Sequence, residues 1–126
     1  MKPGLAPGAS ASHRVAVLPD MTPEFAPHPV YSTYRMARDC EWAARLVILP
    51  YLEDGEEGVG AGLRLRHGRP AQVGATIVVT ATCIRVRSPL VVCRVEASSD
   101  GERCGWGVVH QLLLPSDRLA RTLRQS

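Results

Sequence analysis

The sequence predicts an α+β fold in which an antiparallel sheet wraps around one central helix. Two observations carry this prediction: one apolar stretch has helical spacing, and the chain after it reads as long strands separated by turns. The strands alternate apolar and polar side chains, so one face of their sheet must be covered, and the helix can cover it. An open antiparallel sheet with the helix on one face is the looser alternative. A chain of 126 residues suffices for one such domain.

The helix is expected to begin at Ser32 or Thr33 and to run to about Leu49. Either hydroxyl can cap the first turn, and Pro50 ends the helix. Its far end, residues 46–49, is apolar on all sides, which predicts contact with several neighbours. Apolar residues recur along it at helical spacing, at Met36, Cys40, Ala44 and Val47.

Long strands rich in Val, Ile and Thr follow the helix and a turn at residues 53–58. They are expected at residues 59–67, 75–87, 91–97 and 103–114. They are separated by a loop at residues 70–74, by Ser88-Pro89 and by a hairpin turn at residues 98–101. A short helix, Asp117–Leu123, is expected at the end of the chain.

The chain ahead of the helix divides into a tail, a strand and a loop. Residues 1–13 are rich in Pro, Gly, Ala and Ser and are expected to form a flexible tail, which leaves residues 14–126 as the single folded domain. Within that domain Arg14–Leu18 is expected to be a short strand. The proline-rich stretch Pro19–Pro29 is expected to be an extended loop.

Composition argues against several functional classes. The net charge is +3, but the arginines alternate with apolar and acidic residues, so no nucleic-acid surface is expected, although a mild positive charge suits an anionic substrate such as a CoA ester. No stretch is long enough to cross a membrane, and the N-terminus lacks the apolar core of a signal peptide. No cofactor or metal site is predicted. No C-x-x-C pair occurs among Cys40, Cys83, Cys93 and Cys104, so neither a zinc site nor a redox motif is expected. Because no signal peptide is expected, a cytoplasmic location with free thiols is the default.

Three polar residues are candidates for chemistry. Glu41 is expected in the most buried part of the helix, where burial raises a carboxyl pKa, and the alternative is a surface ion pair with Arg45. His67 shares a strand face with two leucines and should point inward, either as a satisfied core residue or as a proton carrier. Thr33 is either the helix cap or a hydroxyl that holds a substrate carbonyl beside the helix amides.

The arrangement of these residues resembles the fluoroacetyl-CoA thioesterase family. Thr33 precedes the run Glu41-Trp-Ala, which is followed by Pro50-Tyr-Leu-Glu-x-Gly-Glu56 and then by His67. The similarity runs without a gap over residues 30–107. It implies a hotdog fold, a homodimer, an acyl-CoA substrate and a hydrolytic site formed by Thr33, Glu41 and His67.

Two departures from the family pattern affect the expected substrate-binding residues. Gln111 stands where the family usually has an arginine two residues after a histidine, and an amide can donate a hydrogen bond but carries no charge. Phe25 matches the first of two lid phenylalanines, whereas the second position falls near Pro27-His28. Gln111, Phe25 and His28 are therefore the expected substrate contacts, and fluoroacetyl-CoA itself is not implied.

Three functions remain open. The first is hydrolysis of a small acyl-CoA. The second is a hotdog enzyme that acts on an acyl chain bound to a carrier protein in a biosynthetic pathway, as a cyclase, a dehydratase or an editing hydrolase. The third is a non-catalytic module that binds an acyl thioester.

Overall fold

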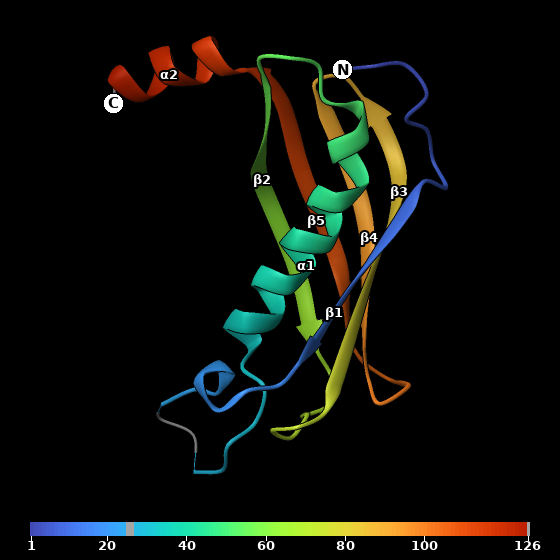
Figure 1. The fold of residues 1–126 in the computed structure, drawn as a ribbon, viewed down its shortest axis with the longest axis vertical. Helices are drawn as coiled ribbons and strands as arrows, with labels where there is room; N and C mark the ends of the chain where they lie inside the picture. Colours follow the sequence, from blue (N-terminus) through green and yellow to red (C-terminus); the bar gives the residue numbers. More distant parts are fainter. Residues whose placement is uncertain (25–26, 126) are drawn as a thin grey trace.

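The computed structural model describes residues 1–24 and 27–125, in which five strands form one antiparallel sheet in the order β1-β3-β4-β5-β2 (Figure 1). The strands are β1 (Ser10–Ala16), β2 (Glu56–His67), β3 (Thr76–Arg87), β4 (Leu90–Ser99) and β5 (Glu102–Pro115). The helices are α1 (Thr33–Ile48), α2 (Ser116–Arg124) and the short 3-10 helices η1 (Pro19–Met21) and η2 (Leu49–Tyr51).

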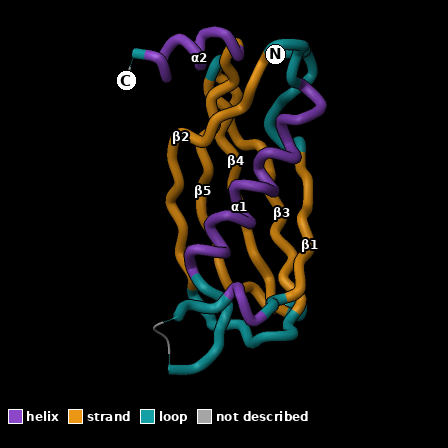
Figure 2. Tube along the Cα trace, turned by 60° about the vertical axis from the view of Figure 1, so that its left-hand side comes forward, coloured by secondary structure: helices purple, strands orange, loops and turns teal. Residues whose placement is uncertain are grey.

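Helix α1 lies across the inner face of the sheet, and the core fills the space between them (Figure 2). The helix contributes residues at helical spacing, and β3, β4 and β5 contribute every second residue, as the two periodicities require. The buried helix residues include Met36, Cys40, Ala43, Ala44 and Val47. This is the hotdog arrangement, so the predicted fold class is confirmed. None of the described helices is long and apolar enough to cross a membrane.

Strand β2 is an edge of the sheet. It pairs with β5 on one side, and no described strand pairs with its other side. A register shift between Gly60 and Gly62 bulges the strand near its middle. Its outer backbone groups are therefore available to another strand.

Several element boundaries differ from those predicted. Strand β1 begins at Ser10 rather than Arg14, so four residues of the expected tail join the sheet, and Ser12 Oγ lies 3.0 Å from Thr80 Oγ1. The rest of that segment is also held by backbone hydrogen bonds, including one from Gly8 N to Cys83 O at 2.8 Å. Backbone pairing needs no apolar side chains, which is why alternation did not reveal these residues. Similarly, β2 begins inside the predicted turn, at Glu56, and the expected loop begins with η1.

Two glycines of β5 allow unusually close packing. A Cβ atom at Gly105 would lie 2.4 Å from Met36 Sδ, and one at Gly107 would lie 2.0 Å from the carbonyl oxygen of Arg64. Gly105 pairs with His67 in the β2–β5 register. The first turns of α1 therefore rest on the sheet directly beside the end of β2.

All four cysteines are buried and free. Cys83 and Cys93 are directly opposite each other on inward-facing strand positions, as expected. Burial raises the pKa of Cys40 to about 12 and that of Cys93 to about 12. Protonated, enclosed thiols pack as small apolar groups and are poor nucleophiles.

Candidate active site

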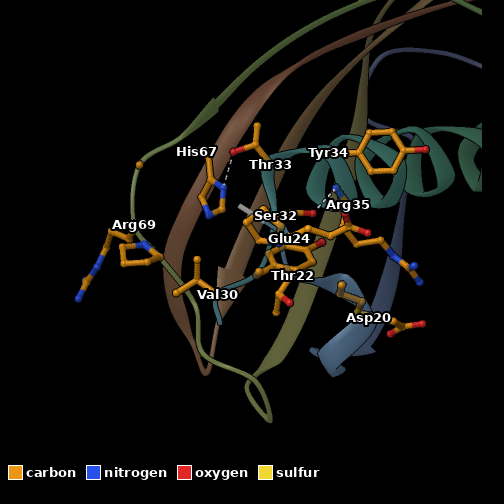
Figure 3. Close-up of a pocket in the computed structure, with 15 residues that line it drawn as sticks. Asp20, Thr22, Glu24, Val30, Ser32, Thr33, Tyr34, Arg35, His67 and Arg69 are labelled. Atoms are coloured by element: carbon orange, nitrogen blue, oxygen red, sulfur yellow. Dashed lines mark hydrogen bonds between the residues drawn. The ribbon is translucent and has the colours of Figure 1, made fainter. Parts of the chain in front are cut away.

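Thr33 and His67 meet where the N-terminal end of α1 faces the end of β2 (Figure 3). Thr33 Oγ1 lies 3.0 Å from His67 Nδ1, within hydrogen-bonding distance. The helix is capped by Ser32, whose Oγ accepts a hydrogen bond from Arg35 N at 3.0 Å. Because Ser32 fills the capping role, the hydroxyl of Thr33 is left for His67.

The other ring nitrogen of His67 is buried without a partner. His67 Nε2 makes no hydrogen bond to any residue that the structure describes. Burial lowers the pKa of His67 by more than a contact with the backbone of Arg69 raises it, which favours the neutral imidazole. A neutral ring anchored through Nδ1 leaves Nε2 to bond a ligand or a reacting water.

These two residues lie in the wall of a cavity of about 630 Å³. Its walls come from residues 20–24, from the start of α1 and from the segment that follows β2, and they are mostly apolar. Tyr34, Arg35 and Arg69 add polar groups (Figure 3). The volume and lining are those of a site for a small organic ligand.

A buried polar network adjoins the cavity. Tyr31, which is 1% exposed, donates a hydrogen bond to Asp39 Oδ2, and its ring meets the His67 ring edge-on at 6.1 Å between centroids. Asp39 is 2% exposed, and its Oδ1 lies 3.4 Å from His13 Nε2 and 3.9 Å from Arg35 Nε. Burial and the hydrogen bond to Asp39 raise the pKa of Tyr31. Our sequence reasoning missed this network, although Asp39 follows Met36 by three residues and so falls on the buried helix face.

Glu41 does not join Thr33 and His67 within one copy of the chain. It follows Thr33 by eight residues, which is about 12 Å along a helix. Its side chain is exposed rather than confined, so the expected buried carboxylate is wrong. The alternative ion pair with Arg45 does not form either, since Arg45 contacts Glu57 at 3.9 Å and the carbonyl of Gly58 at 3.3 Å.

Glu41 instead borders a second cavity, of about 250 Å³, together with Gln111. Its carboxylate lies against Gly60 of β2, where a Cβ atom would be 3.5 Å from Glu41 Oε2. Gln111 is 4% exposed, and its Nε2 donates a hydrogen bond to Ala44 O at 3.0 Å. The amide at this position therefore holds α1 to β5.

The two remaining substrate-contact predictions have different outcomes. Phe25 lies outside the described residues. His28 is exposed and is not among the described residues that line the cavity at Thr33 and His67. Its contact with substrate stays a prediction.

Comparison with known proteins places the chain in a family. The family model for fluoroacetyl-CoA-specific thioesterase matches residues 17–117. The fluoroacetyl-CoA thioesterase of Streptantibioticus cattleyicolor is 30% identical over 134 residues, which cover 99% of this chain and 96% of that protein.

Solved structures agree with this assignment. A Thermus thermophilus hypothetical protein of the thioesterase superfamily is 35% identical with a TM-score of 0.93, over 98% of this chain and 93% of that one. The fluoroacetyl-CoA thioesterase structure is 29% identical with a TM-score of 0.89, over 98% of both chains. The chain therefore belongs to the fluoroacetyl-CoA-specific thioesterase family and is a thioesterase-type hydrolase.

Proposed function

We propose that the protein hydrolyses a small acyl-CoA thioester in the cavity at Thr33 and His67. The observation that carries this proposal is the bonded Thr33–His67 pair, whose free Nε2 is buried in the wall of a ligand-sized cavity. A variant of the fluoroacetyl-CoA thioesterase, 28% identical with a TM-score of 0.87, has been solved in complex with acetyl-CoA. An acyl-CoA is therefore the substrate class to test first.

The groups at the site suit attack on a thioester carbonyl. In the proposed reaction Glu41 acts as base or nucleophile, while Thr33 and His67 orient the reactants and bond the carbonyl oxygen. If Glu41 acts as base, it takes a proton from a water molecule whose oxygen forms the new C–O bond, the C–S bond breaks, and the proton passes to the departing thiolate. If Glu41 acts as nucleophile, its carboxylate first displaces the thiolate to give an acyl anhydride, which water then cleaves to the free acid and the carboxylate. The amides of the first helical turn carry partial positive charge where the oxyanion develops.

This mechanism requires Glu41 from a second copy, because Glu41 lies outside the cavity of its own chain. We therefore propose a homodimer formed through the free edge of β2. Antiparallel pairing centred near Leu63 would place Gly60 of one copy opposite residues 65–67 of the other. Since the carboxylate of Glu41 lies against Gly60, the partner's Glu41 would then approach His67.

Gln111 favours a second candidate, in which the acyl group is carried by a protein rather than by CoA. The uncharged amide is occupied by Ala44 O, so the position offers no charge to a CoA phosphate. In either case the four buried free thiols suit a reducing cytoplasm, which is the compartment that we propose.

Release of free thiol from a panel of thioesters tests the proposal. Acetyl-CoA, fluoroacetyl-CoA and longer acyl-CoAs should be compared with the same acyl groups on a carrier protein. We expect hydrolysis of a short acyl-CoA that is lost in His67→Ala and Thr33→Ala but retained in Thr82→Ala, which alters a threonine of β3 that is not among the described residues lining the cavity. Cleavage of carrier-bound esters alone would favour the second candidate. Binding of acyl thioesters without cleavage of any would identify a non-catalytic module.

A further inference from the structure

The outer face of the sheet, opposite α1, carries a cationic hollow of about 590 Å³. We call it the arginine hollow. Its charged and aromatic lining consists of Arg64, Arg66, Arg94, Arg103, Glu96 and Trp106. In the strand register Arg64 and Arg94 flank Val108 from either side, and Arg66 lies opposite Trp106. Directly paired residues share a sheet face, so these side chains project together.

Most of the positive charge in the arginine hollow is uncompensated. Arg103 lies 3.9 Å from Glu96 and stacks over Trp106 at 4.0 Å from the ring centroid. Within the described part of the chain, Arg64, Arg66 and Arg94 form no ion pair. Neighbouring strands are about 4.8 Å apart, so these arginines are separated by roughly 7–12 Å and repel one another. An anion bound among them would relieve that repulsion.

The arginine hollow lies beside the cavity of the proposed active site. Arg66 directly precedes His67, and the two side chains point to opposite faces of β2. Trp106 also lies against Gly68, since a Cβ atom there would be 2.7 Å from Trp106 Cζ3. Gly68 itself lines the cavity. Only the end of β2 therefore separates the two sites.

We propose that the arginine hollow binds the phosphate-bearing nucleotide of an acyl-CoA whose acyl group occupies the cavity at His67. This inference rests on the proposed function. Planar guanidinium groups match phosphate oxygens bidentately, and the guanidinium of Arg103 that lies over Trp106 presents its own plane for stacking a base. An acidic protein surface would require the charges but not the aromatic ring, so the lining favours a nucleotide over a protein.

Substrates with and without the nucleotide test the proposal. Acetyl-CoA carries the phosphates and adenine, whereas the acetyl thioester of pantetheine presents the same reacting group without them. The test variant combines Arg64→Gln, Arg66→Gln and Arg94→Gln. A matched control removes the same number of charges elsewhere, from helix α2, by Arg118→Gln, Arg121→Gln and Arg124→Gln.

The triple variant in the hollow should raise KM for acetyl-CoA by about tenfold or more and leave kcat within about twofold, since the lost contacts bind a remote part of the substrate. Its KM for acetyl-pantetheine should stay the same, and the α2 control should change neither value. Added salt should raise the wild-type KM for acetyl-CoA alone. Circular dichroism and thermal unfolding establish that each variant is folded.

Three outcomes would overturn the proposal. The wild-type enzyme could have equal KM values for the two thioesters, or the triple variant could show the same rise in KM for both. The third outcome is a rise in KM of the triple variant only for acyl groups on an acidic carrier protein. If no thioester is cleaved, the proposed function fails while the hollow stays testable by calorimetry with coenzyme A. Binding of coenzyme A at least about tenfold weaker in the triple variant than in the α2 control would support the hollow. Unchanged binding would refute it.

Discussion

Subunit exchange between two inactive variants tests whether Glu41 acts across a dimer. One variant is Glu41→Gln and the other is His67→Asn. Loss of a catalytic base or of the group that orients it costs about 10²-fold or more in rate, so each variant alone should be nearly inactive. Both groups border cavities rather than filling the core, so both variants should fold.

The mixture should regain activity if Glu41 is supplied in trans. A heterodimer then has one site with neither residue and one site with both, since the intact His67 and the intact Glu41 come from different chains. Random reassociation makes half of the dimers mixed, so about a quarter of the wild-type rate should return. If both groups act within one chain, every site in the mixture lacks one of them and no activity returns.

The assay is thiol release after joint unfolding and refolding of the two variants in equal amounts. The side chain of Glu41 is exposed, so Glu41→Gln should change the free energy of unfolding by less than about 0.5 kcal/mol. Denaturant titration checks this value. A mixture that stays inactive would refute action in trans. A Glu41→Gln enzyme with near-normal rates would remove Glu41 from the site, and light scattering at 13.7 kDa would exclude the dimer.

Three further predictions concern stability and pH. Tyr31→Phe should lower the free energy of unfolding by about 1–3 kcal/mol, since it removes a buried hydrogen bond to Asp39, and calorimetry should show no such loss for the exposed Tyr34→Phe. Because the pKa of His67 is lower in the folded protein than in the unfolded chain, the unfolded chain takes up a proton at this histidine at a higher pH than the folded protein does. The free energy of unfolding should therefore fall as pH drops below about 6.5. This pH dependence should weaken in His67→Asn, as urea titrations at several pH values would reveal. Gln111→Leu should cost about 1 kcal/mol by removing its hydrogen bond to the helix, and an unchanged urea midpoint would contradict this.

The sequence predicted the fold well because the central helix and the strands of the sheet each have a local pattern of apolar and polar residues. The helix was expected from Ser32 or Thr33 to about Leu49 and spans Thr33–Ile48. The strands after it were found from alternation and turn residues, with ends shifted by a few residues where backbone pairing continues past the apolar pattern.

The site was predicted less completely, because side chains from separate elements assemble only in the folded chain. Thr33 and His67 come together as the resemblance implied, but Glu41 was misplaced because its position along the helix was weighed and its position around the helix was not. Tyr34, Arg38, Glu41 and Arg45 recur at helical spacing and form the outward stripe. The Tyr31–Asp39 network joins residues from three parts of the chain, and a local sequence pattern does not predict contacts between separate segments.

The absence of a side chain at Gly105 has a consequence for how this family can diverge. Met36 occupies the space that a Cβ atom at Gly105 would need, and it does so next to the helical turn that carries Thr33. A larger residue at 105 must displace the buried end of the Met36 side chain, and where that side chain cannot move aside it pushes the helix from the sheet and lengthens the contact between Thr33 and His67. A smaller residue at position 36 removes this conflict. These two positions should therefore covary among relatives that keep the threonine and the histidine. In relatives that have lost that pair, substitutions at the two positions should be independent.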